Sequence, residues 1–134
     1  MDRDSKVWLY CRLVQHDETA MLRQEKILRD SVEDGYVIVG VTHEYGPGLK
    51  IDRPGLREIQ AKTREGIIGQ IRVIRTDRIC RNALLAEQWI QDTIQYGVSI
   101  AMLGDGRLTH FRLPKFEYVA CYIRFGSEMH AGAV

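Results

Sequence analysis

Strand-like and helix-like segments alternate along this chain, and that alternation constrains the fold more than any other feature of the sequence. Four continuous apolar runs have the character of buried strands. They cover residues 6–14, 36–42, 67–74 and 98–103. The intervening segments, at about residues 17–34, 53–65 and 81–96, have helical character. This order predicts an α/β fold, a three-layer domain with a mainly parallel four- to five-stranded sheet and helices on both faces.

Local signals mark where the expected helices begin and end. Asp17 supplies a capping residue ahead of the first helix. Asp52 is expected to cap the second helix, where Pro54 lies in the first turn, which tolerates proline. Gly35 and Gly66 are placed to end the first and second helices.

The length of 134 residues and a hydrophobic content of 45% fit one domain with a substantial core. We expect residues 1–103 to form that core and residues 104–134 to form a short C-terminal tail. A last helix is expected from residue 114 to about residue 128, with no separate DNA-binding domain after it. Since no apolar run has the length of a membrane span, we expect no membrane association. The odd number and wide spacing of the cysteines lead us to expect a reducing, cytoplasmic location.

Charge and cysteine usage narrow the classes of function. The net charge is only +1, so any contact with nucleic acid must come from a local cluster of basic residues. The three cysteines contain no Cys-x-x-Cys pair, which argues against a disulfide framework or a zinc ribbon. The four histidines show no ligand spacing with cysteines or acidic residues, so we expect neither a metal nor a cofactor.

Arginines gather at the predicted carboxyl ends of strands, where parallel sheets place functional residues. Arg12 is near the end of the first strand, Arg53 starts a helix, and Arg78 and Arg81 follow the third strand. Arginine binds phosphate oxygens with two parallel donors, and helix N-termini also favour anions. Each motif alone is better explained as a solvated turn or a helix-starting ion pair.

The order of these motifs identifies a family resemblance. Tyr10-x-Arg12 on the first strand precedes Gln24 in the first helix. Asp-Arg-Pro-Gly-Leu opens the second helix at residues 52–56, and Asp-Arg-x-x-Arg follows the third strand at residues 77–81. Together they resemble the catalytic domain of the serine site-specific recombinases, the resolvase/invertase family. The resemblance spans about residues 6–103.

The resemblance implies roles for individual residues. Its phosphate-binding arginines correspond to Arg12, Arg53, Arg78 and Arg81, and its active-site glutamine corresponds to Gln24. The acidic residue proposed to assist proton transfer corresponds to Asp77. Simpler interpretations stay open, since Asp77 fits a helix cap and Gln24 a surface position. Lys62 falls where some members have a further basic residue, but an exposed helix lysine is the better interpretation.

Three departures from the family pattern bear on activity. Val14 stands at the position of the nucleophilic serine, and its hydrocarbon side chain forms no phosphoseryl link. Cys11 lies three residues earlier, on the other side of the strand, so it is expected to pack as a buried hydrophobe. The loop that usually reads Asp-x-x-Ser-Gly has Glu44 in place of the aspartate and Pro47 in place of the serine. The candidate C-terminal helix is also shorter than the family's dimerisation helix.

These observations lead to three functional hypotheses. The first is a resolvase-like domain related to DNA integration and recombination that does not cut DNA. It retains an arginine cluster for DNA phosphates, or it acts as a regulatory subunit, as a homodimer or paired with an active recombinase. The second is an active fragment that cleaves and rejoins DNA strands. The third is a protein-interaction module on the same fold.

Overall fold

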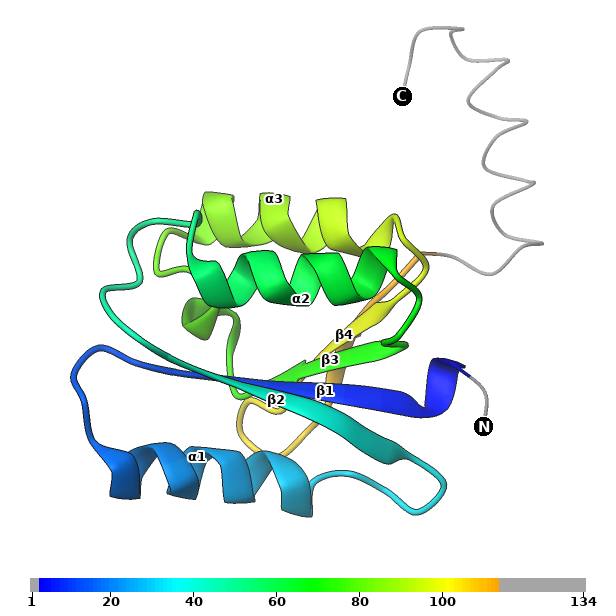
Figure 1. Cartoon of the computed structure of the whole chain (residues 1–134), viewed down its shortest axis with the longest axis horizontal. Coiled ribbons are helices and arrows are strands. Elements are labelled where there is room, and N and C mark those ends of the chain that lie inside the picture. Colours follow the sequence, from blue (N-terminus) through cyan, green and yellow to red (C-terminus); the bar gives the residue numbers. More distant parts are fainter. Residues whose placement is uncertain (1–2, 114–134) are drawn as a thin grey trace, which may run out of the picture.

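The chain folds around a five-stranded sheet in the computed structural model, which describes residues 3–113. Helices cover both faces of the sheet (Figure 1). The strands are β1 (Lys6–Leu13), β2 (Val37–Tyr45), β3 (Gln70–Val73), β4 (Ser99–Met102) and β5 (Thr109–Phe111). The helices are α1 (Glu18–Asp30), α2 (Pro54–Arg64) and α3 (Ala83–Ile94), with 3-10 turns η1 (Arg3–Ser5) and η2 (Thr76–Arg78).

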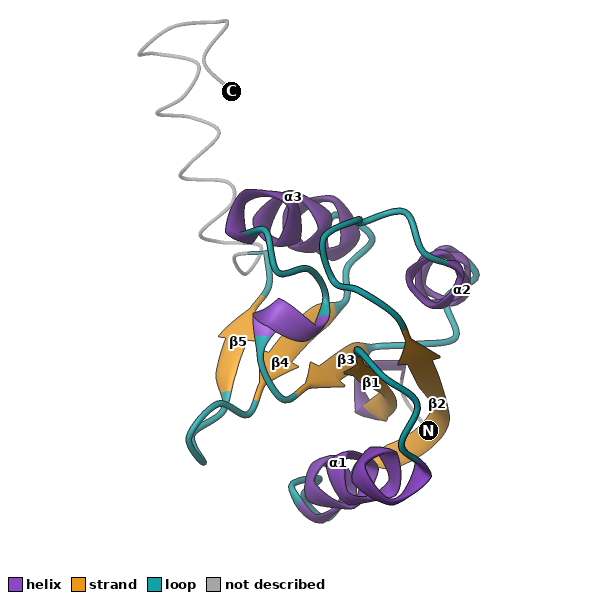
Figure 2. Ribbon diagram, turned by 90° about the vertical axis from the view of Figure 1, so that its left-hand side faces the viewer, coloured by secondary structure: helices purple, strands orange, loops and turns teal. Residues whose placement is uncertain are grey.

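The order of strands across the sheet is β2-β1-β3-β4-β5. The first four strands are parallel, and β5 pairs with β4 in the antiparallel sense. Figure 2 shows α1 on one face of the sheet and α2 and α3 on the other. The predicted α/β architecture with a mainly parallel sheet is therefore confirmed. A fifth strand was allowed for, but β5 was not located in the sequence, because it has only three residues and they are largely exposed.

Two hydrophobic clusters fill the spaces between sheet and helices. The larger lies on the α2–α3 side and includes Trp8 and Trp89, as expected for packing residues. The smaller lies between the sheet and α1, where Cys11 is fully buried beside Met21 and Leu28. The expectation that Cys11 packs as a small hydrophobe is confirmed.

Several element boundaries differ from the sequence-based expectations. The strand β2 continues to Tyr45, so Glu44 belongs to a strand and its side chain is buried. Asp52 does not cap α2, since Arg53 is the N-cap residue and the Asp52 carboxylate pairs with Arg57. Asp17 caps α1 as expected, accepting a hydrogen bond of 3.0 Å from the Ala20 amide.

The predicted last helix, residues 114–128, lies outside the described residues. Within residues 3–113, no helix is long and apolar enough to cross a membrane.

Candidate active site

The predicted arginine site lies at the edge of the sheet where the parallel strands end. Arg12 is the penultimate residue of β1, and Asp77 and Arg78 lie in η2, just after β3. Arg53 immediately precedes α2, whose N-terminus faces the same edge, on the left-hand side of Figure 1. Because the carboxyl ends of parallel strands meet at one edge, residues distant in sequence come together there.

Arg12 is buried and binds three backbone carbonyls. Its Nε donates to Arg78 O at 2.7 Å, Nη1 to Gly46 O at 2.9 Å and Nη2 to Asp77 O at 2.8 Å. Burial, followed by the positive charge of Arg53, lowers the pKa of Arg12 below its ordinary value. An arginine stays protonated at neutral pH despite such a shift. Arg12 therefore connects β1 to the segment after β2 and to η2.

Arg53 is also buried, and it lies against the same turn. Its Nη2 donates to the Tyr10 hydroxyl at 3.0 Å, to Arg78 O at 3.2 Å and to Ile79 O. Its Nε lies 3.3 Å from Glu44 Oε1. Neither Nε nor Nη1 of Arg53 has a hydrogen-bond partner among the described residues, and both atoms are buried.

Glu44 organises the start of α2, a role that the sequence analysis gave to Asp52. Its Oε2 accepts a hydrogen bond of 2.6 Å from the Gly55 amide, and its Oε1 accepts one of 2.7 Å from the Tyr10 hydroxyl. A Cβ at Gly55 would lie 2.7 Å from Glu44 Cδ, so only glycine permits this approach. The extra methylene of Glu44 relative to aspartate lets a strand residue reach the helix. The sequence analysis missed this contact, although an acidic residue near the end of one strand and a glycine in the first turn of the next helix are compatible with it.

The Tyr10 hydroxyl lies within this buried group of charges. Burial, together with the Glu44 hydrogen bond, raises the pKa of Tyr10 above its ordinary value, although Arg53 acts in the opposite direction. The phenolate form of Tyr10 is therefore disfavoured, and its hydroxyl serves as a structural donor to Glu44.

Gln24 is buried on α1, so the interpretation as a surface residue is wrong. Its Oε1 accepts a hydrogen bond of 3.1 Å from the Arg12 amide, and its Nε2 donates to Arg12 O at 3.3 Å. Gln24 thus satisfies both backbone groups of Arg12.

Asp77, Arg78 and Arg81 form the more open part of the site. The Asp77 side chain is partly exposed and its Oδ2 lies 3.5 Å from Arg75 Nη2, whereas its Oδ1 is buried without a described partner. The interpretation of Asp77 as a helix cap is wrong, since Asn82 caps α3. The Arg78 Nε is buried and has no partner among the described residues, and Arg81 is exposed.

Gly48 lets the Arg12 and Arg81 side chains come together. A Cβ at Gly48 would lie 2.4 Å from Arg12 Nη2 and 2.9 Å from Arg81 Cγ. The Arg81 amide donates to Gly48 O at 2.7 Å, which fixes the backbone at this approach. The structure therefore brings Arg12, Arg53, Arg78 and Arg81 to one edge, with Arg12 and Arg53 inside and Arg81 outside.

Val14 follows β1 directly at this edge and is 51% exposed. It lines a shallow cavity of ≈ 370 Å³ together with His16 and Asp17. The Gly46 amide donates to Leu13 O at 2.9 Å, so the segment after β2 passes next to Val14. Val14 is therefore accessible at this edge, and its side chain carries only hydrocarbon.

Cys11, Thr76 and Cys80 do not line the cavity beside Val14. Burial, followed by the charge of Glu25, raises the pKa of Cys11 to about 12, and its thiol faces α1. Thr76 lines a cavity that also includes Ala86 and Phe111, on the α3 side of the sheet. Cys80 is buried, with its Sγ 3.7 Å from Leu49 O.

Lys62 does not join the arginines. It lies nine residues after Arg53 on α2, which corresponds to about 13 Å along a helix. No group of three or more histidine, cysteine or acidic side chains within residues 3–113 is arranged to hold a metal.

Comparisons with known proteins place the chain in a family. The sequence model described as "Resolvase, N terminal domain" matches residues 7–116. No curated protein matches the sequence significantly. Among solved structures, the C-terminal catalytic domain of IS1535 TnpA, an IS607-like serine recombinase, is 25% identical with a TM-score of 0.58. That match covers 92% of this chain and 82% of the other.

Two further solved structures share the fold. The N-terminal catalytic domain of TP901-1 integrase has a TM-score of 0.63 and 16% identity, with coverage of 93% of this chain and 98% of the other. A resolvase family site-specific recombinase from Streptococcus pneumoniae has a TM-score of 0.64 and 20% identity, with coverage of 92% and 86%. The family model covers most of the chain, and the fold and the order of the sequence motifs agree with that family. This protein therefore belongs to the resolvase family of serine recombinases.

Proposed function

We propose that this domain binds the phosphate backbone of DNA without cutting it. The observation that carries the proposal is an assembled arginine cluster beside an exposed Val14. Strand cleavage by a serine recombinase needs a hydroxyl in line with the leaving oxygen, and Val14 supplies none. Positive groups around the phosphate can still bind it in the absence of that attack.

The arginines divide into supporting and contacting residues. The Arg12 guanidinium donates hydrogen bonds to backbone carbonyls. It therefore holds η2 in place. Arg81 is exposed, Arg78 is partly exposed, and buried donors of Arg53 and Arg78 have no described partner. The exposed guanidinium groups suit a phosphate oxygen. DNA would therefore contact Arg78 and Arg81 first, with Arg53 behind them.

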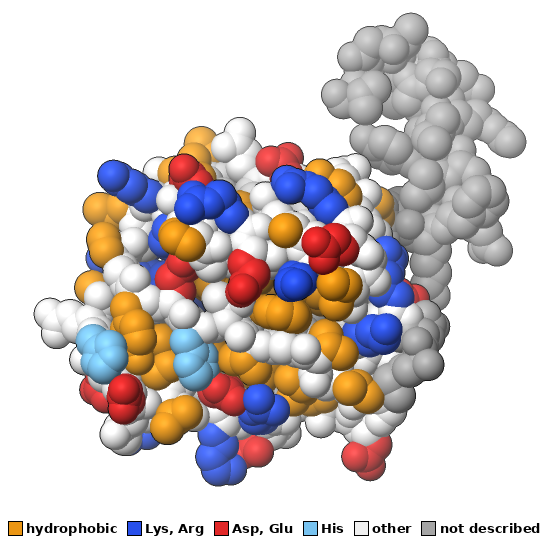
Figure 3. Space-filling view, in the orientation of Figure 1, with side chains coloured by type: hydrophobic (Ala, Val, Ile, Leu, Met, Phe, Trp, Pro, Cys, Tyr) orange, Lys and Arg blue, Asp and Glu red, His pale blue; other side chains and the backbone are white. Residues whose placement is uncertain are grey.

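Affinity from such a site is local and modest. The net charge of +1 provides little long-range attraction. Figure 3 shows basic and acidic side chains interspersed over one face of the molecule, with no broad basic surface. A non-cleaving domain with weak DNA contacts fits a regulatory subunit, either as a homodimer or together with an active recombinase.

DNA binding is tested by the dependence of affinity on salt concentration. Each lost phosphate contact reduces the slope of log affinity against log salt by about 0.9 for duplex DNA. We expect Arg78→Ala and Arg81→Ala each to weaken binding and to reduce that slope. Arg64→Ala is the matched control, since Arg64 ends α2, away from the N-terminus that faces the arginine site. Unchanged binding in Arg78→Ala and Arg81→Ala, or an equal effect of Arg64→Ala, would show that these arginines are not a DNA site.

The absence of cleavage is tested with suicide DNA substrates that trap a covalent intermediate. We expect no protein–DNA adduct with the wild-type chain. An adduct would identify it as an active recombinase. The Val14→Ser variant shows whether the remaining site still supports attack, and an adduct formed by that variant alone would support loss of the hydroxyl as the cause of inactivity.

A further inference from the structure

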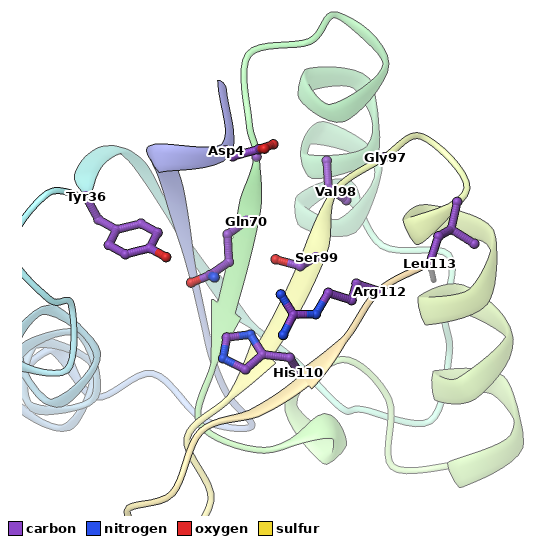
Figure 4. Close-up of a pocket in the computed structure, with 10 residues that line it drawn as sticks. Asp4, Tyr36, Gln70, Gly97, Val98, Ser99, His110, Arg112 and Leu113 are labelled. Atoms are coloured by element: carbon purple, nitrogen blue, oxygen red, sulfur yellow. The ribbon is translucent and has the colours of Figure 1, made fainter. Parts of the chain in front are cut away.

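A second polar cavity lies at the opposite edge of the sheet, where the parallel strands begin. Its volume is ≈ 550 Å³, and residues near the starts of β1, β3 and β4 line it together with residues at the end of β5. Figure 4 shows these side chains around the opening. The cavity shares no lining residue with the arginine site, and the proposed DNA contacts do not use it.

The sheet register explains why polar side chains collect there. Gln70 on β3 pairs with Ser99 on β4, and Ala101 on β4 pairs with His110 on β5. Continuing the β4–β5 register places Arg112 beside Ser99. Residues two apart on a strand share a face, so Gln70, Ser99, His110 and Arg112 project from the same side of the sheet.

This side of the sheet is only partly covered by helices within the described residues. The helix α1 packs on β1 and β2 and leaves β4 and β5 open on this face, as Figure 2 shows. Phe111 projects to the other face, where it lines a cavity with Ala86 and Ile90 of α3. The polar cross-strand pairs of β3, β4 and β5 therefore face an open cavity.

Several donors in the cavity have no described partner. Gln70 is 4% exposed and its Oε1 accepts from Arg72, while its Nε2 makes no hydrogen bond within residues 3–113. Arg112 is exposed and makes no ion pair with a described side chain. Figure 4 shows Arg112 and His110 projecting into the same space as Ser99.

The charges around this end of the cavity favour an anion. Burial, followed by the positive charges of Arg112 and Arg72, lowers the pKa of His110, while Glu33 acts in the opposite direction. Asp4 is the acidic residue that lines the cavity, and Figure 4 places it at the far end from His110. The electrostatic potential at His110 is therefore positive.

We propose that this cavity binds a small organic phosphate, with Arg112, Ser99 and the Gln70 amide holding the phosphate group. A cavity of ≈ 550 Å³ is larger than a bare phosphate requires and falls in the range of small-molecule sites. Tyr36 lines the cavity and provides an aromatic surface for the rest of the ligand. The site is independent of the proposed DNA contacts.

The test uses the full 134-residue chain and two probes, inorganic phosphate and phenyl phosphate, at constant ionic strength. The readout is the NMR signal of the His110 imidazole, because a bound anion raises the pKa of a nearby histidine. We expect saturable shifts, a higher His110 pKa at saturation, and tighter binding of phenyl phosphate than of inorganic phosphate.

Two variants separate a site from general charge attraction. Arg112→Gln is expected to weaken phenyl phosphate binding by about tenfold or more, since a charge-assisted hydrogen bond is lost. Arg107→Gln is the matched control, because Arg107 is an exposed arginine in the preceding turn that does not line the cavity. Equal effects of the two variants, or shifts that never saturate, would overturn the proposal. Displacement of phenyl phosphate from His110 by a short DNA duplex would also overturn it, by assigning this face to nucleic acid.

Discussion

Gln24 hydrogen-bonds both backbone groups of Arg12, accepting from its amide at 3.1 Å and donating to its carbonyl at 3.3 Å. This pair links the middle of α1 to the end of β1. Because the Arg12 guanidinium in turn binds carbonyls of η2 and Gly46, the position of the whole arginine site depends on a side chain that need not touch DNA.

Gln24→Ala tests that dependence. The substitution leaves the buried amide and carbonyl of Arg12 without partners, so we expect the free energy of unfolding to fall by about 2 kcal/mol. Urea denaturation measures this change in the free energy of unfolding. Arg23→Ala, an exposed neighbour on α1, is the control and should change stability by less than about 0.5 kcal/mol. A similar small change for Gln24→Ala would contradict the role assigned to this residue.

Glu44→Gln removes the negative charge that faces Arg53. The buried guanidinium then lacks its counterion, and we expect a loss of about 3 kcal/mol in unfolding free energy. The double variant Glu44→Gln/Arg53→Met should lose less unfolding free energy than the sum of the losses in the two single variants. Glu65→Gln, at the exposed C-terminal end of α2, is the control. Additive losses in the double variant would show that the two residues do not act as a pair.

Gly48→Ala places a methyl group where the Arg12 and Arg81 side chains approach each other. Relief of the 2.4 Å contact with Arg12 Nη2 requires the guanidinium to move, at a cost of about 1–3 kcal/mol in unfolding free energy. We also expect weaker DNA binding, measured by gel shift. Leu49→Ala, at a residue that is 64% exposed, is the control. Unchanged stability and binding in Gly48→Ala would mean that this contact is easily accommodated.

Alkaline pH should destabilise the fold through Cys11. Its pKa rises from an ordinary value of 9.0 to about 12 in the folded chain, chiefly because of burial. Between these values the unfolded state binds fewer protons than the folded state, so stability falls as pH increases. The slope contributed by one thiol reaches at most about 1.4 kcal/mol per pH unit.

Chemical denaturation across this pH window measures that slope, with Cys11→Ala as the comparison. The variant loses some stability at every pH because it leaves a cavity, but its dependence on pH should be shallower. Tyr10 also has a raised pKa and contributes in the same direction to both proteins. Identical slopes for wild type and variant would contradict a contribution from Cys11.

The sequence predicted the features that depend on local patterns. Alternating apolar runs predicted the parallel strands and the three helices, since a strand and a helix bury residues at different periods. The order of the arginine motifs predicted the family. The predicted parallel sheet brought four arginines to one edge, because parallel strands end together. These are Arg12, Arg53, Arg78 and Arg81. The strand β5 escaped prediction, since three largely exposed residues carry no period.

Only the tertiary structure decided where each side chain is directed and what it binds. Arg12 and Arg72 are both fully buried, which their charge alone does not indicate. Arg12 binds carbonyls of η2, while Arg72 binds Ser31 O at 2.7 Å and Gln70 Oε1 at 2.6 Å. The capping of α2 by Glu44 and the cavity between Gln70 and Arg112 likewise join residues that are far apart in the chain. Such contacts depend on how strands pair and helices pack, so the spacing of residues along the sequence does not reveal them.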